Sequence, residues 1–121
     1  MPNPFCHVEL HSNDLEKSKK FYGQLFNWKL EDMPDGTHGY TMIQVGEGTG
    51  GGMMKSPMPS GPSAWLAYVM VDDIVASTAK AKSLGATLLL DVTPAGDYGR
   101  FSVFTDPQGA QFAMFQPNPR S

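Results

Sequence analysis

The stretch HVELHSNDLEKSKKFYGQLFNW, residues 7–28, decides the fold of this chain. Its first part alternates polar His7, Glu9 and His11 with apolar residues, which is typical of a strand with one polar and one apolar face. Three candidates for a helix N-cap follow at positions 12–14. The stretch therefore predicts a strand, a tight turn and an amphipathic helix, with the three polar side chains on one side of the strand.

The rest of the chain continues with short elements separated by turns. Gly85 ends a second helical pattern, and a D-P-Q-G turn precedes the last strand-like segment. The Gly-rich run 46–52 lacks the order and the following helix of a phosphate loop, so it is interpreted as a hairpin connection. The expected helices are about 15–26 and 74–84, and the expected strands are about 5–11, 28–31, 40–45, 52–55, 65–71, 87–92, 101–105 and 111–115.

The two halves of the chain repeat one pattern. Sliding one half along the other by 59 positions (69 − 10 = 59) places Leu10 on Val69 and Asp14 on Asp73. Each half then reads as strand, helix and three strands. A repeat of this size is a structural unit. We expect one domain over 1–121, with module one at about 5–56, a linker at about 57–63 and module two at about 64–117.

The composition limits the classes of function. The chain has 121 residues, 40% of them hydrophobic, which is enough for one domain with a real core. Its formal net charge of −3 argues against binding to nucleic acid. Nothing in the chain has the length of a membrane span, and the single cysteine, Cys6, fits a reducing cytoplasm. The expected location is therefore cytoplasmic, with neither membrane nor nucleic acid as a partner.

Three segments carry a resemblance to a known family. They are residues 7–28, the segment YVMVDDIVASTAKAKSLGA (68–86) and the segment FTDPQGAQFAMFQP (104–117). Together they resemble the vicinal oxygen chelate superfamily, which includes glyoxalase I, bleomycin-resistance proteins and extradiol dioxygenases, and most of all its small lactoylglutathione-lyase-related proteins. The resemblance implies an α+β fold of two βαβββ modules in an open eight-stranded sheet around a cavity, with the helices outside. It also implies a homodimer.

The resemblance further implies four positions for a metal ligand, one on the first and one on the fourth strand of each module. The first-strand positions fall on His7 and Leu66. The closing position falls on Ala113, and the remaining one lies within 51–54, which holds Gly and Met alone. Only His7 is a metal-binding residue, and zinc needs three protein ligands even in an open site. We therefore expect no metal and no other cofactor.

His7 and Glu9 are the candidate catalytic residues. An imidazole beside a carboxylate can act as an acid or base, and we expect the two side chains to be hydrogen-bonded in the cavity. A rebuilt metal site with His11 and His38 is a further possibility, although the strand rise separates His7 from His11 by roughly 13 Å. The residues expected to line a ligand site are His11, Leu66, Tyr68, Met70, Ala113, Phe115 and Arg100.

Three functions remain open from the sequence. The first is a metal-independent binder of a small, largely apolar molecule in the sheet cavity, since apolar linings with a few polar groups are typical of such sites. The second is an enzyme of the lyase, isomerase or dioxygenase-like kind that uses His7 and Glu9. The third is a structural or regulatory dimer with a closed core, in which the polar groups satisfy one another.

Overall fold

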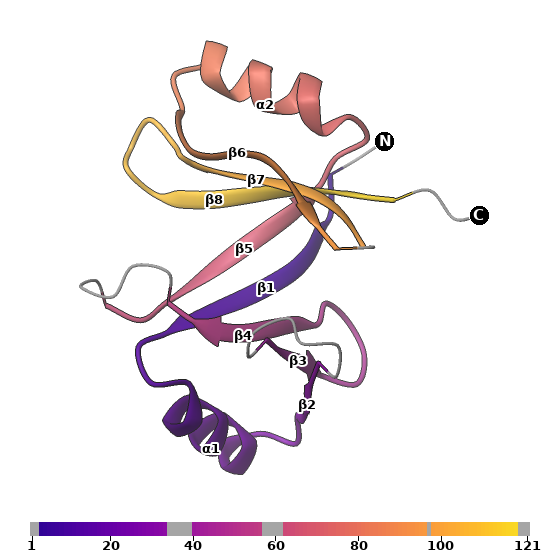
Figure 1. Ribbon diagram of the computed structural model, residues 1–121, viewed down its shortest axis with the longest axis vertical. Helices are drawn as coiled ribbons and strands as arrows, with labels where there is room; N and C mark the ends of the chain where they lie inside the picture. The colour runs from indigo at the N-terminus through magenta and orange to yellow at the C-terminus, as the bar shows by residue number, and fades with distance from the viewer. Residues whose placement is uncertain (1–2, 34–39, 57–61, 97, 119–121) are drawn as a thin grey trace. The chain divides into compact units, whose positions relative to one another are not determined.

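The computed structural model describes residues 3–33, 40–56, 62–96 and 98–118, and these contain eight strands and two helices (Figure 1). The strands are β1 (Phe5–Ser12), β2 (Lys29–Asp32), β3 (Thr41–Gln44), β4 (Gly51–Lys55), β5 (Ala64–Met70), β6 (Thr87–Ala95), β7 (Gly99–Thr105) and β8 (Gln111–Pro117). The helices are α1 (Leu15–Leu25) and α2 (Ile74–Ser83).

The strands form one mixed, open sheet in the order β2-β3-β4-β1-β5-β8-β7-β6. The α+β fold class expected from the sequence is thereby confirmed. Each half of the chain contributes four strands and one helix, in the order strand, helix and three strands. The cavity expected inside that sheet stays a prediction. The chain divides into two compact units, residues 7–66 and residues 1–6 with 67–121, and each is described by itself.

In the unit 7–66, β1 runs parallel to β4, which is followed by the antiparallel strands β3 and β2. The buried core is Leu10, Ile43 and Met53. Leu15 and Tyr22 of α1 pack against this core, so the apolar face of β1 is covered by the helix that follows it in sequence. Apolar burial of this kind is the main stabilising term of the unit.

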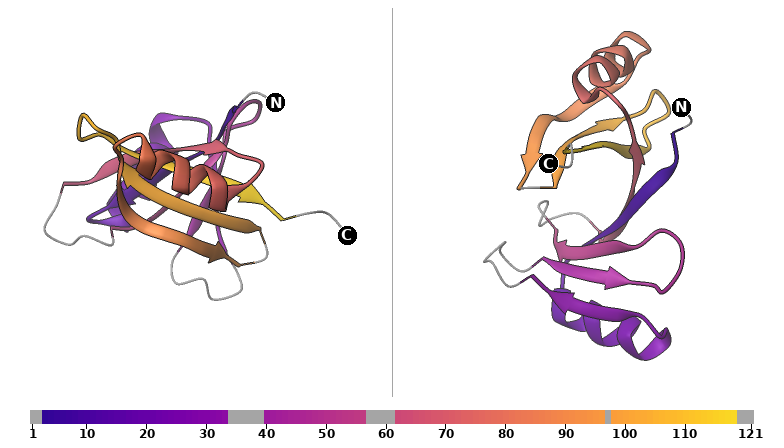
Figure 2. Two further views of the ribbon diagram at one scale, coloured as in Figure 1. Left: turned by 90° about the horizontal axis from the view of Figure 1, so that it is seen from above. Right: turned by 90° about the vertical axis from the view of Figure 1, so that its right-hand side faces the viewer.

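In the unit 1–6 with 67–121, β5 runs parallel to β8, and β7 and β6 follow as antiparallel neighbours. Val71, Ile74 and Met114 form its buried core. Figure 2 shows α2 lying across the strands β6, β7 and β8. The second unit therefore repeats the plan of the first.

Both helices begin at an aspartate. The Asp14 side chain accepts a hydrogen bond from the Lys17 amide at 3.2 Å, and Asp73 accepts one from the Ala76 amide at 3.1 Å. These bonds satisfy amides that a helix N-terminus leaves without a partner inside the helix. After α2, Gly85 adopts a φ of 106°, a left-handed conformation that favours glycine. The predicted helix starts and the predicted stop at Gly85 are thus confirmed.

One expectation about the elements is wrong, the length of the sixth strand. The first helix ends where it is expected, at about position 26, since its last residue is Leu25 and its C-cap is Phe26, which has an extended φ of −122°. At this end of the helix, Leu25 and Phe26 are 56% and 44% exposed. The sixth strand, expected at about 87–92, is longer than its apolar pattern indicates, because β6 continues to Ala95 through shifts in its register with β7.

Neither helix in the described parts of the chain is long and apolar enough to cross a membrane. His38, considered above as a metal ligand, lies outside the described residues, as does most of the predicted linker 57–63.

Candidate functional site

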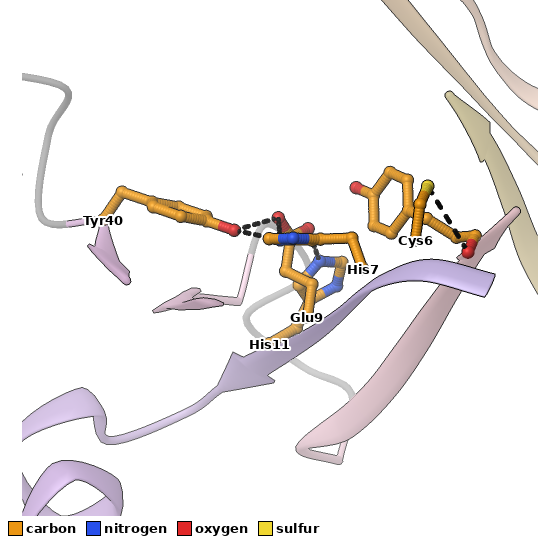
Figure 3. A network of polar contacts seen from close by, with 6 residues as sticks. Cys6, His7, Glu9, His11 and Tyr40 are labelled. Carbon is orange, nitrogen blue, oxygen red and sulfur yellow. Dashed lines mark hydrogen bonds and ion pairs between the residues drawn. The ribbon is translucent and has the colours of Figure 1, made fainter. Parts of the chain in front are cut away.

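The candidate site is built on the polar face of β1 in the unit 7–66 (Figure 3). His7, Glu9 and His11 project from the same side of the strand, as their alternation predicts. The His11 Nε2 atom lies 2.8 Å from Glu9 Oε1, and the two groups form an ion pair whenever His11 is protonated. The Glu9 side chain is 10% exposed, while the imidazoles of His7 and His11 are 25% and 19% exposed. The carboxylate is therefore buried between two imidazoles that solvent reaches.

Tyr40 joins His7 to Glu9. Its hydroxyl oxygen lies 2.6 Å from His7 Nε2 and 2.9 Å from Glu9 Oε2. The His7 Nε2 atom is 3.9 Å from Glu9 Oε2, which is too long for a hydrogen bond. The direct hydrogen bond between His7 and Glu9 that the sequence suggested is therefore wrong. The two residues are linked through a tyrosine.

The donors and acceptors fix where the protons of this network lie. A carboxylate only accepts hydrogen bonds, so Tyr40 donates its one proton to Glu9 Oε2, and His11 donates from Nε2 to Oε1. The Tyr40 oxygen then accepts a hydrogen bond from His7 Nε2. In their neutral forms both imidazoles therefore carry the proton on Nε2, and their Nδ1 atoms have the acceptor lone pairs.

Burial sets the charge of His7. The pKa of this imidazole is lowered from 6.5 because burial disfavours the charged form, while the negative charge of Glu9 opposes the shift. His7 is thus neutral at neutral pH. A neutral imidazole can accept a hydrogen bond or a proton from a bound molecule.

A glycine makes room for Tyr40. In the parallel pairing of β1 with β4, Gly52 lies beside Glu9. A Cβ atom at Gly52 would lie 2.0 Å from the Tyr40 hydroxyl oxygen and 2.3 Å from the ring carbon that bears it. Only a residue without a side chain lets the Tyr40 ring lie over β4 and reach the carboxylate on β1.

The same position is the fourth-strand ligand position implied by the family resemblance. In module two, Ala113 pairs with Tyr68, and by the 59-residue offset Tyr68 is the counterpart of Glu9. Glu9 pairs with Gly52, so Gly52 is the counterpart of Ala113. Among residues 51–54, the strand register therefore favours Gly52 as the ligand position that the resemblance implies for this strand. The Tyr40 hydroxyl lies where a side chain at Gly52 would begin.

These positions do not fit a metal ion. Gly52, Leu66 and Ala113 have no donor atom in their side chains, and the Nε2 atom of His7 is hydrogen-bonded to Tyr40. In the described parts of the chain, no three His, Cys, Asp or Glu side chains are arranged to hold a metal. The donor set falls short of the three protein ligands that zinc requires.

The remaining predicted ligand residues lie on several elements. Leu66 is 2% exposed, Tyr68 is 6% exposed and Ala113 is fully buried, whereas Met70 and Phe115 are half-buried. Arg100 is exposed and donates to Gln116 Oε1 at 3.3 Å. Their place in a ligand cavity stays a prediction.

Two contacts concern nearby residues. The indole of Trp65 donates to the Tyr22 hydroxyl of α1 at 3.3 Å. The Cys6 thiol is half-buried and donates to the Tyr68 carbonyl at 3.8 Å (Figure 3). Burial raises the pKa of this thiol, which makes it a poor nucleophile.

Sequence reasoning missed Tyr40. The alternation of polar and apolar residues from Tyr40 onward predicts a strand and says nothing about where the Tyr40 hydroxyl lies. In the structure β3 begins one residue later, at Thr41. The available signal was the pair of glycines at the start of β4, because a glycine within a strand marks a close approach by another group.

Comparison with known proteins identifies the family. Residues 5–114 match the model of the Glyoxalase/Bleomycin resistance protein/Dioxygenase superfamily. The chain belongs to this superfamily, as the resemblance of its sequence implied.

Two curated relatives are informative. The chain is 38% identical over 81 residues to the "Putative glyoxylase CFP32" of Mycobacterium tuberculosis (strain CDC 1551 / Oshkosh), which covers 67% of this chain and 31% of the relative. It is 28% identical over 123 residues to the anthracycline biosynthesis protein DnrV of Streptomyces peucetius, covering 89% of this chain and 45% of that protein. The chain thus spans less than half the length of both relatives.

Solved structures agree with the fold. The hypothetical protein BH1468 from Bacillus halodurans C-125 superimposes with a TM-score of 0.72 at 15% identity, covering 100% of this chain and 99% of that chain. The methylmalonyl-CoA epimerase from Mycobacterium tuberculosis superimposes with a TM-score of 0.71 at 17% identity, covering 95% of this chain and 88% of that chain. At such identities the likeness shows the fold alone.

Proposed function

We propose that this chain is a metal-independent binding protein for a small, largely apolar molecule that carries a hydroxyl group. The observation that carries the proposal is the buried Glu9 carboxylate, whose two oxygens accept from Tyr40 and His11 while both neighbouring imidazoles remain partly exposed. A buried network with exposed ends can be completed by a ligand. Metal independence is supported by the missing donors at the family's ligand positions.

The proton arrangement selects the polar group of the ligand. With Nε2 of His11 protonated, its Nδ1 atom is an acceptor, so a hydroxyl or amine hydrogen suits this imidazole better than a carbonyl oxygen. We expect the apolar body of the ligand to lie against Leu66, the apolar residue of the same unit that the sequence assigns to the site. Matching one polar group precisely and burying the rest is the usual design of a small-molecule site.

Three one-ring probes test this function. Benzyl alcohol offers a hydroxyl donor, acetophenone only an acceptor and ethylbenzene neither. The readout is the imidazole resonances of His7 and His11 in protein with labelled histidine. We expect saturable shifts that are strongest with benzyl alcohol and weakest with ethylbenzene. Equal responses to all three probes, or none, would contradict the proposal.

The matched control is Tyr40→Phe. This variant keeps the ring over Gly52 but removes the hydroxyl that orders His7 and Glu9. We expect the preference for benzyl alcohol to fall while the weak response to ethylbenzene stays. Metal analysis of the purified protein, with a zinc, nickel or iron titration, tests metal independence, and tight stoichiometric metal would overturn that part.

A second candidate function is acid/base catalysis by His7. The observation that favours it is the lowered pKa of His7, which keeps the imidazole neutral and able to take a proton from a carbon next to a carbonyl. Glu9, reached through Tyr40, would then stabilise the imidazolium. The test is deuterium incorporation from heavy water into the methyl group of acetophenone. Incorporation no faster than with His7→Asn would exclude this reaction.

We also expect a homodimer located in the cytoplasm. The expectation rests on the family resemblance and on the single cysteine. Sedimentation equilibrium of the purified chain distinguishes a dimer from a monomer directly.

A further inference from the structure

The unit 7–66 has a cavity on the opposite side of β1 from the polar network. Its volume is about 290 Å³, and its lining includes Val8, Ile43, Gly51, Trp28 and Trp65. Val8 alternates with His7 and Glu9 along β1, so it points to the other face of the sheet. The cavity is therefore separate from the candidate site described above.

The strand register explains why the cavity exists. Gly51 on β4 pairs with Val8 on one side and with Ile43 on the other, so the middle of this row of the sheet lacks a side chain. A Cβ atom at Gly51 would lie 1.8 Å from the Val8 carbonyl oxygen. The backbone thus excludes any other residue here, and the gap is built into the pairing of the strands.

Two tryptophans form the walls of the cavity. The rings of Trp28 and Trp65 lie 6.4 Å apart at an interplanar angle of 78°. Tyr22 contacts both of them, since it stacks on Trp28 at 5.8 Å and accepts a hydrogen bond from the Trp65 indole at 3.3 Å. The rings are held in place, while Trp65 remains 40% exposed at the opening.

We propose that this cavity is a second binding site, for a small, neutral, planar aromatic molecule. Two aromatic walls at a steep angle offer a stacked and an edge contact to one flat ring, the two arrangements that aromatic pairs prefer. Among the described residues, none that lines the cavity carries a charge, so none of them compensates the desolvation of an ion. A volume of about 290 Å³ lies at the small end of ligand sites, which limits the occupant to one or two rings.

The chain provides its own reporter for this site. It contains two tryptophans, and both line the cavity. Tryptophan fluorescence therefore reports on this site, while the resonances of His7 and His11 report on the opposite face. The two proposals can fail independently.

The test is a quenching titration with nitrobenzene, a neutral flat ring, compared with nitromethane, which quenches without a ring. We expect saturable quenching with nitrobenzene and only a linear, collisional dependence with nitromethane. Linear quenching with both compounds would overturn the proposal.

The variant Val45→Phe fills the cavity from its edge, because Val45 is a half-buried residue of the lining. We expect about a tenfold weaker apparent affinity for nitrobenzene. The matched control is Val69→Phe, an identical change at a half-buried residue that lines a cavity of the other unit, and it should leave the titration unchanged. If Val45→Phe does not fold, Thr49→Phe at the exposed rim replaces it. Unchanged affinity in the folded variant would overturn the proposal.

Discussion

The first strands of the two modules occupy equivalent places in the fold but carry side chains of opposite polarity. β1 and β5 each run parallel to the last strand of their module, and each is followed by a helix that has an aspartate as its N-cap. Where β1 presents three polar side chains, β5 presents apolar or aromatic ones at the counterpart positions: His7 and Leu66, Glu9 and Tyr68, His11 and Met70. The same strand arrangement therefore forms with the polar residues of β1 and with the apolar or aromatic residues of β5. The polar set is therefore not required by the architecture.

The fourth strands differ in a matching way. Gly52 beside Glu9 leaves room for Tyr40, the residue just before the neighbouring strand β3, whereas Ala113 beside Tyr68 is fully buried. The polar network of module one thus depends on two departures from module two, a carboxylate on the first strand and a missing side chain on the fourth. Each can be removed separately.

Replacing Glu9 should have the largest effect on stability. In Glu9→Leu, the His11 Nε2–H group and the Tyr40 hydroxyl lose their acceptor in a partly buried place. We expect a loss of about 3 kcal/mol in the free energy of unfolding, because unsatisfied polar groups cost more than a hydrogen bond gains. Urea denaturation at neutral pH measures it.

The control for Glu9→Leu replaces the whole polar network by apolar side chains. The combined variant His7→Leu, Glu9→Leu, His11→Met and Tyr40→Phe removes the polar groups of all four residues together. We expect it to lose less than about 1 kcal/mol, because replacing a whole buried polar set by apolar groups is often neutral. If it is as unstable as Glu9→Leu, the network is structural, and the third function considered above, a closed structural core, is favoured.

Gly52→Ala should have the second-largest effect. The new methyl group would displace the Tyr40 ring and break the hydrogen bonds of its hydroxyl, at a cost of about 2 kcal/mol. The reverse change in module two, Ala113→Gly, should cost only about 1 kcal/mol, since it adds chain entropy without breaking a network.

A double-mutant cycle checks the cause of the Gly52→Ala effect. In a Tyr40→Ala background the clash is absent, so adding Gly52→Ala should cost far less than it does in the natural chain. An equal cost in both backgrounds would mean that Gly52 acts through something other than Tyr40.

The pH dependence should show the smallest effect. The pKa of His7 is lower in the folded chain than its ordinary 6.5, so between these two values the unfolded chain binds more protons. Stability is therefore fully present above pH 6.5 and falls as the pH decreases toward the lower, folded value. His7→Asn should flatten this part of the curve in thermal unfolding. Leu66, the counterpart in module two, contributes nothing that titrates.

Much of the fold could be predicted from the sequence because its signals are local. Asp14, Asp73 and Gly85 act on their own helix ends, and strand alternation put His7, Glu9 and His11 on one face. The sixth strand was predicted too short because its apolar pattern ends at Val92, whereas β6 continues to Ala95 through shifts in its register with β7.

The network itself was beyond local signals. Tyr40 reaches Glu9 across an intervening strand, and this contact depends on the register that places Gly52 between them. Register follows from the pairing of distant segments, which alternation within one strand does not reveal. The link between His7 and Glu9 was therefore expected as a direct hydrogen bond instead of one through a hydroxyl.

The central claim is that the polar face of β1 is a ligand site and not a closed part of the core. The most direct test is to follow the His7 and His11 imidazole resonances while benzyl alcohol is added to the natural chain and to Gly52→Ala. The account predicts a saturable shift in the natural chain that is lost in Gly52→Ala, where Tyr40 no longer orders the network. Resonances that do not move in the natural chain, or that move equally in both proteins, would contradict it.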